Sequence, residues 1–284
     1  MTLRLLPVLV ALSILVPTDV FAQPVSPWII PGIPNPFLPA PTPSAAPSAA
    51  PQAPAPASGP PVVFELFTSR DCAACESAEY EAIRLVTQPV AGARLIPLAY
   101  HVEFYGGATT TDPYVLPAAT RRQQTYDSAR GRVYTPQAIV DGDREFTGSE
   151  DGTARTAIAA AARQSKVNVE VSRAPRLVGP TALALSIRYG GSGRRAATIT
   201  AVLTESSLVE IHHGGLTDYD RKPLAPVVRS IQEVGSASPG GGTIEATMTI
   251  PAGAVRANLT AVVLLQDASS HHILGAGTLA AGIL

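Results

Sequence analysis

The sequence predicts an α/β domain over residues 61–165 followed by an all-β domain over residues 166–284, after a signal and a linker. Two patterns carry this prediction. In the first region short apolar runs alternate with helix-length segments, and in the second they recur without helices, between glycine-rich turns. A third observation concerns chemistry. The only two cysteines, Cys72 and Cys75, directly follow the first apolar run.

Residues 1–22 have the pattern of a secretory signal peptide. Arg4 supplies positive charge, Leu5 to Val16 form a short apolar core, and small residues precede a cut after Ala22. This core is too short for a membrane span, and no later segment is long enough, so we expect no span after signal removal. The expected location is periplasmic or secreted, where disulfides persist.

Residues 23–60 are expected to be a linker. They contain thirteen prolines and no charged residue, a composition typical of extended polyproline-like chain. The first half of the linker is apolar around Trp28, the only tryptophan. We expect this apolar segment to dock either on the folded part of the chain or on a partner.

The 61–165 region should contain seven elements in the order strand, helix, strand, helix, strand, strand, helix. Their expected bounds are 61–67, Cys72 to about Val86, 93–100, 117–130, 137–140, 144–147 and 149–164. Asp71 or Ser69 is a possible N-cap for the first helix. Asp141-Gly142 between the last two strands predicts a hairpin. The first two strands should be parallel and the third antiparallel.

This order of elements is that of the thioredoxin fold, and it brings several polar residues to one sheet edge. Cys72 follows the first strand, His101 follows the second, and Tyr134-Thr135-Pro136 precede the third. Sites in open α/β sheets lie at such an edge. We expect a cis peptide before Pro136, with Tyr134 and Thr135 exposing backbone groups to a bound substrate chain.

The Cys-x-x-Cys spacing suits thiol–disulfide exchange. Cys72 would be the nucleophile, because a helix N-terminus lowers the pKa of a thiol, and Cys75 would be the resolving thiol. Glu65, inside an apolar strand, is either a proton acceptor or part of a structural pair, and His101 is a second candidate acceptor. An inert local disulfide or half of a metal site are the alternatives for the two cysteines, although no second cysteine pair completes a tetrathiolate site.

The 166–284 region should form a small antiparallel sandwich. Alternating apolar and polar residues bounded by glycine-rich turns predict seven strands. These are 167–171, 182–189, 197–205, 227–234, 243–250, 259–266 and 272–278.

Several short motifs together resemble one known family. In chain order they are Glu65-Leu66-Phe67-Thr68-Ser69, Cys72-x-x-Cys75, Leu98 to Glu103, Arg121-x-Gln123, Val133 to Gln137 and Phe146-x-Gly148-Ser149. They resemble the exported bacterial proteins catalogued as domain of unknown function 1223, over about residues 61–280. The resemblance implies a thioredoxin-like domain followed by a β-rich domain and a redox role. The chain departs from the family in having Glu76-Ser77-Ala78-Glu79 where Pro-Pro-Ala-Asp is common.

These observations predict an exported thiol–disulfide oxidoreductase-like protein that acts on other exported proteins with thiols or disulfides, without an organic cofactor. The net charge of −1 and the lack of basic blocks argue against nucleic acid as a partner. Two alternatives stay open. One is a non-catalytic binding or assembly protein, and the other is a copper-handling protein that uses Cys72, Cys75 and His101.

Overall fold

A computed structural model describes residues 59–103, 112–130, 133–193, 196–212 and 220–280. The predicted signal peptide, the apolar segment around Trp28 and nearly all of the predicted linker lie outside the described residues. Among those described, no helix has the length and apolar character needed to cross a membrane.

The first part of the chain forms the seven predicted elements in the predicted order. They are β1 (Pro61–Thr68), α1 (Cys75–Thr87), β2 (Arg94–His101), α2 (Pro117–Arg130), β3 (Gln137–Val140), β4 (Arg144–Thr147) and α3 (Asp151–Ala161). β1 pairs with β2 in parallel and with β3 antiparallel, which confirms the expected strand directions. Asp141 and Gly142, with φ angles of 49° and 67°, form the tight turn between β3 and β4.

Helix α1 begins three residues later than the sequence predicted. Its N-cap is Ala74, which makes no side-chain capping bond, so neither Asp71 nor Ser69 caps the helix. The chain first makes a turn closed by a hydrogen bond from Cys72 N to Ser69 O (3.2 Å), and then one from Cys75 N to Cys72 O (3.0 Å). Cys75 is therefore the first helical residue, and Cys72 lies in the turn before it.

The second part of the chain is entirely β apart from one short 3₁₀ turn, within the residues described. Seven strands match the predicted ones within a few residues: β5 (Val169–Arg173), β6 (Ala182–Gly190), β7 (Ala197–Glu205), β10 (Val227–Ala237), β11 (Gly241–Thr249), β12 (Leu259–Asp267) and β13 (Ile273–Ala280). The sequence patterns did not predict a short hairpin formed by β8 (Val209–His212) and β9 (Asp220–Pro223).

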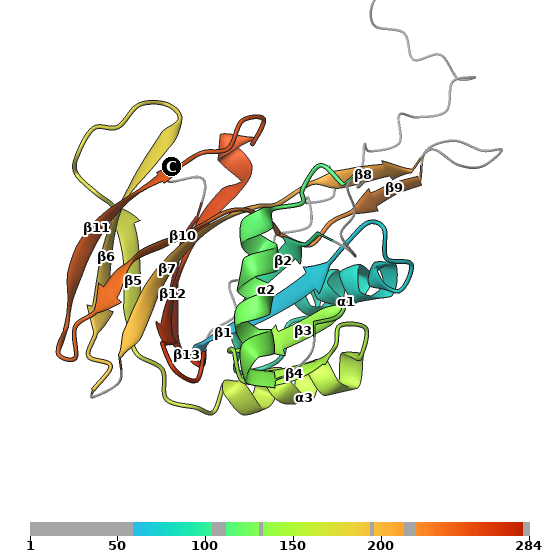
Figure 1. Ribbon diagram of the computed structural model, residues 1–284, viewed down its shortest axis with the longest axis horizontal. Coiled ribbons are helices and arrows are strands. Elements are labelled where there is room, and N and C mark those ends of the chain that lie inside the picture. The colour runs from blue at the N-terminus through green and yellow to red at the C-terminus, as the bar shows by residue number, and fades with distance from the viewer. Residues whose placement is uncertain (1–58, 104–111, 131–132, 194–195, 213–219, 281–284) are drawn as a thin grey trace, which may run out of the picture. The chain divides into compact units, whose positions relative to one another are not determined.

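The predicted fold class, an α/β thioredoxin-like domain followed by an all-β sandwich-like domain, is wrong. A single mixed sheet of eight strands, in the order β13-β12-β7-β10-β2-β1-β3-β4, runs through both regions (Figure 1). The two regions join where β10 lies parallel to β2, with Val227 opposite Ala99. An edge strand exposes unpaired backbone groups that favour pairing with another strand. Periodicity predicted the strands, but it carries no signal for which edges pair.

Three apolar clusters surround this sheet. α1 and α3 cover one face of β1, β2 and β3, with Leu66 and Leu85 at the centre. α2 covers the opposite face, where Phe67 and Tyr126 pack together. At the other end of the large sheet, the three-stranded sheet β11-β6-β5 forms a second layer over β7, β12 and β13 (Figure 1).

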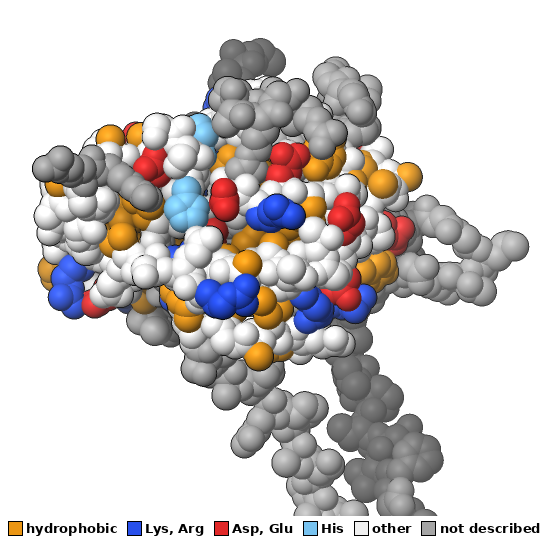
Figure 2. All heavy atoms as spheres, turned by 90° about the horizontal axis from the view of Figure 1, so that it is seen from below, with side chains coloured by type: hydrophobic (Ala, Val, Ile, Leu, Met, Phe, Trp, Pro, Cys, Tyr) orange, Lys and Arg blue, Asp and Glu red, His pale blue; other side chains and the backbone are white. Residues whose placement is uncertain are grey.

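The surface carries charges of both signs. On the face seen in Figure 2, Lys and Arg side chains lie between Asp and Glu side chains rather than in a patch of one sign. Such a face has no strong field of one sign to attract a polyanion.

Candidate functional site

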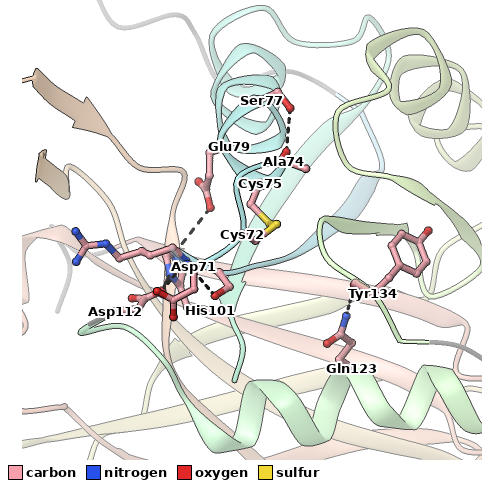
Figure 3. Close-up of a disulfide and its surroundings, with 12 residues drawn as sticks. Asp71, Cys72, Ala74, Cys75, Ser77, Glu79, His101, Asp112, Gln123 and Tyr134 are labelled. Atoms are coloured by element: carbon pink, nitrogen blue, oxygen red, sulfur yellow. Dashed lines mark hydrogen bonds and ion pairs between the residues drawn. A yellow bond between two sulfur atoms is a disulfide. The ribbon is translucent and has the colours of Figure 1, made fainter. Parts of the chain in front are cut away.

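The two cysteines form a disulfide at the point where β1 leads into α1 (Figure 3). Cys72 is 8% exposed and Cys75 is 2% exposed. Cys72, in the turn, is therefore the more exposed cysteine, and Cys75, the first residue of α1, is the more buried one. These are the positions expected of an attacking and a resolving thiol.

His101 lies on the face of the sheet that α1 covers. Alternation along the strands decides this, because His101 pairs with Thr68, two residues beyond Leu66 in the α1 cluster. Its Nδ1 lies 2.6 Å from Asp112 Oδ2. Burial opposes ionisation of Asp112, but the hydrogen bond and charge of His101 outweigh it, so the pKa of Asp112 lies below its usual value. An ionised carboxylate can only accept a hydrogen bond, so Nδ1 of His101 carries the proton that Asp112 accepts, and Nε2 faces a different group.

The other nitrogen of His101 faces Glu79. Glu79 lies one helical turn after Cys75 on the buried side of α1, and its Oε1 is 3.9 Å from His101 Nε2 (Figure 3). Burial raises the pKa of Glu79 above its ordinary value, and the nearby His101 only partly offsets this. Glu79 Oε1 and His101 Nε2 are both buried without a hydrogen-bond partner. Two unpartnered polar atoms therefore face each other in the buried space beside the cysteines.

A cavity of about 100 Å³ joins these groups to the disulfide. Both cysteines, Glu79 and His101 line it from the α1 side, and Glu210, Lys222 and Leu224 line it from the β8–β9 hairpin and the segment after it. Two ion pairs hold the hairpin over the cysteines. In one, Arg70 of the turn contacts Glu210 of the hairpin, and in the other, Lys222 of the hairpin contacts Glu76 of α1. The second half of the chain thus completes the site.

The Thr135–Pro136 peptide is cis, as predicted. Tyr134 O accepts a hydrogen bond from Gln123 Nε2 at 2.8 Å, and Thr135 Oγ1 is buried without a partner. In the view of Figure 3, Tyr134 lies on the other side of the disulfide from His101. Substrate binding by Tyr134, Thr135 and Pro136 stays a prediction.

Glu65 is not brought to the cysteines. It lies on the opposite face of β1, where its Oε1 accepts from Arg122 Nε at 2.5 Å and its Oε2 accepts from Tyr126 Oη at 2.6 Å. The structural pair is therefore the alternative that the geometry supports, and the buried carboxyl group in the cysteine cavity is that of Glu79. The reason is the two-residue period of a strand, which directs Leu66 toward α1 and Glu65 away from it.

A metal site and a second cavity are two other candidate sites among the described residues. Within the described ranges, no group of three or more His, Cys, Asp or Glu side chains is arranged to hold a metal ion. Copper binding by Cys72, Cys75 and His101 stays an untested alternative. A larger cavity of about 700 Å³ lies between α3 and the β3–β4 turn. No cysteine or histidine lines it, and its wall on α3 consists of small residues such as Gly152, Ala157 and Ala160.

Comparison with known families shows which family the chain belongs to. Residues 63–266 match the family model described as Protein of unknown function (DUF1223). The chain belongs to this family. The resemblance drawn from the sequence motifs is thereby confirmed as to family. No curated protein matches the chain.

Two solved structures resemble this DUF1223 chain over most of its length. A protein from Agrobacterium tumefaciens is 26% identical and aligns with a TM-score of 0.56, covering 78% of this chain and 94% of that one. HBP35 of Porphyromonas gingivalis is 14% identical, with a TM-score of 0.54, covering 79% and 76%. The second likeness shows the fold alone.

Sequence reasoning missed four residues of this DUF1223 site: Glu79, Asp112, Glu210 and Lys222. A signal for Glu79 was present, because it follows Cys75 by four residues and shares the helix face of Ala78 and Ala82. Asp112 lies in the loop between β2 and α2. Glu210 and Lys222 lie on a short hairpin far along the chain. Only the pairing of β10 with β2 brings the hairpin to the cysteines.

Proposed function

We propose that the protein is an exported thiol–disulfide oxidoreductase-like protein that exchanges disulfides with other exported proteins through Cys72 and Cys75. The observation that carries this proposal is the disulfide beside a buried Glu79–His101–Asp112 network. An inert staple does not require a carboxyl of raised pKa with one unpartnered oxygen, or an unpartnered imidazole nitrogen, in the same cavity. The signal-like residues 1–22 support a periplasmic or secreted location.

The first step is attack by a partner's thiolate on Cys72 Sγ. A bond forms between the partner's sulfur and Cys72, and the Cys72–Cys75 bond breaks with its electron pair on Cys75 Sγ. Glu79 or His101 gives this sulfur a proton, and Asp112 stabilises the positive charge on His101 while it carries the proton.

The second step releases the partner. A second thiolate of the partner attacks its own sulfur in the mixed disulfide and expels Cys72 as a thiolate. The partner has then lost two electrons and gained a disulfide, and Cys72 and Cys75 are reduced. The same steps in reverse reduce a partner's disulfide, and the relative potentials of the two couples set the direction.

Trapping of the mixed disulfide tests the proposal. Cys75→Ser removes the resolving thiol, so adducts that dissociate under reductant should accumulate on Cys72 when the full chain is expressed with its own leader. Cys72→Ser should trap far fewer, because Cys75 is the more buried sulfur. If Cys75→Ser traps nothing while the same partners stay bound non-covalently to both variants, the protein is a binding protein instead.

A further inference from the structure

Lys222, on β9, places a buried cation in the cavity that holds the cysteines. It is 8% exposed and lines this cavity together with Cys72 and Cys75. Its Nζ lies 3.9 Å from Glu76 Oε1 and 5.5 Å from the centre of the Tyr80 ring. A buried ammonium group is costly unless negative charge compensates it, so its surroundings decide what it is there for.

The other charges around the cavity leave Lys222 under-compensated. Arg70 is ion-paired with Glu210. Burial raises the pKa of Glu79 and the charge of Lys222 offsets this only in part, so Glu79 is an incomplete partner for Lys222, and His101 contributes no negative charge. Asp112, behind His101, is bonded to that ring. Among the described residues that line the cavity, the remaining anion is Glu76, whose side chain is 59% exposed and therefore screened by water. Within that described lining, Lys222 thus has no fully buried, ionised carboxylate of its own.

We propose that Lys222 stabilises the thiolate of Cys72 when the disulfide is reduced. The cysteine sulfurs are the groups in this cavity that become anionic on reduction, and a nearby cation lowers the pKa of a thiol. Cys72 takes this role rather than Cys75, because Cys72 lies in the turn before α1 and is the more exposed of the two cysteines. The inference rests on the proposed function only in treating Cys72 as the attacking thiol.

This assignment gives the β8–β9 hairpin a chemical role. The start of α1 and the turn before it carry Asp71 and Glu76 close to Cys72, and both oppose thiolate formation. The nearest local cation, Arg70, is ion-paired with Glu210, so a cation from another part of the chain adds to the positive charge at this site. Lys222 brings it from about 150 residues away in sequence.

The test is the pH dependence of alkylation at Cys72. The reduced full chain is treated briefly with iodoacetamide across a pH series, and labelling at each cysteine is read by mass mapping. Lys222→Gln should raise the apparent pKa of Cys72 by about one unit. Lys222→Arg should restore it. Arg188→Gln, which removes an exposed cation on β6 and changes the net charge equally, should leave it unchanged.

A folded Lys222→Gln variant with an unaltered Cys72 pKa, or a failure of Lys222→Arg to restore it, would overturn the assignment. If Lys222→Gln does not fold, the comparison of Glu76→Gln with Glu76→Gln/Lys222→Gln replaces it, since the double variant leaves no unpaired partner. A Cys72 pKa higher in the double variant supports the assignment, and equal values reject it.

This readout is independent of any partner protein. Iodoacetamide needs only the thiolate, so the Lys222 effect can be present even if Cys75→Ser traps no partner. In that case the oxidoreductase proposal fails and the Lys222 assignment stands. Trapping of partners with no Lys222 effect would instead support the oxidoreductase proposal and reject the Lys222 assignment.

Discussion

Two buried carboxylates on opposite faces of the same sheet, Glu65 and Glu79, have contrasting surroundings. Both oxygens of Glu65 are bound, one by Arg122 Nε and the other by Tyr126 Oη. Gln266, on β12, donates to the same Tyr126 hydroxyl at 3.0 Å and extends this network into the second half of the chain. Glu79 has a weak contact from Ala225 N at 3.4 Å on one oxygen, and its other oxygen has no hydrogen-bond partner.

In the proposed mechanism, this difference separates a structural acid, Glu65, from a proton donor, Glu79. A buried carboxyl group held by a guanidinium and a hydroxyl is fixed in place, so it stabilises one packing arrangement. A buried carboxyl with an unpaired oxygen and a raised pKa can change its protonation state without breaking the fold. Position in an apolar strand made Glu65 the more conspicuous residue in the sequence, but the partners of each group decide its use.

The largest effect should come from removing Arg122 from its contact with Glu65. Arg122→Met would leave Glu65 buried without its cation, and we expect a loss of about 3–5 kcal/mol in the free energy of unfolding, measured with urea. The double variant Glu65→Gln/Arg122→Met should recover most of it, because no charge is then stranded. A loss below about 1 kcal/mol in the single variant would mean that the network does not hold the fold. The Cys72 thiol pKa should not change in either variant.

Removing the reactive acid should alter chemistry rather than stability. Glu79→Gln cannot give a proton to the Cys75 sulfur, so reduction of the disulfide by dithiothreitol at about pH 6 should slow by about tenfold. The ratio of wild-type to variant rates should approach one as the pH rises, because Glu79 then loses its proton in the wild type as well. Stopped-flow measurements of both proteins over the same buffers give this ratio directly.

Glu81 provides the matched control for Glu79. It is a buried acid on the same helix, but it faces Asp151 and Arg84 rather than the cysteine cavity. Glu81→Gln should therefore leave the rate of disulfide reduction unchanged. Equal slowing in Glu79→Gln and Glu81→Gln would show a general effect of helix α1 and would contradict the proton-transfer role of Glu79.

The smallest effect concerns the pH dependence of stability. Burial, followed by a hydrogen bond with Asp151 and repulsion from it, raises the pKa of Glu81 from 4.5 to about 7. The folded state thus binds this proton more tightly than the unfolded state, and stability falls as the pH rises from about 4.5 to 7.

Glu81→Gln should remove this loss. Thermal unfolding at about pH 8 should show the variant more stable than wild type by about 1 kcal/mol. The gain is no larger because Asp151, whose pKa is lowered by its hydrogen bond with Glu81, loses part of its own stabilisation in the variant. The gain should vanish at about pH 4. A gain that is equal at both pH values would point to packing rather than to the charge of Glu81.

The sequence by itself determined the local elements and the covalent centre of the site. Apolar periodicity located all but two short strands, Asp141-Gly142 specified its hairpin, and the Cys-x-x-Cys spacing after β1 specified the disulfide. These features depend on residues within a few positions of one another, so the pattern and the backbone chemistry are enough to specify them.

Tertiary structure alone decided the fold class and the surroundings of the cysteines. Pairing of β10 with β2 merged the two predicted regions into one sheet, and it carried Lys222 to the cysteine cavity and Ala225 N to Glu79. Contacts between residues about 150 positions apart depend on which sheet edges pair. Backbone hydrogen bonds between strands form in the same way for most sequences, so a local sequence pattern does not indicate which edges will pair.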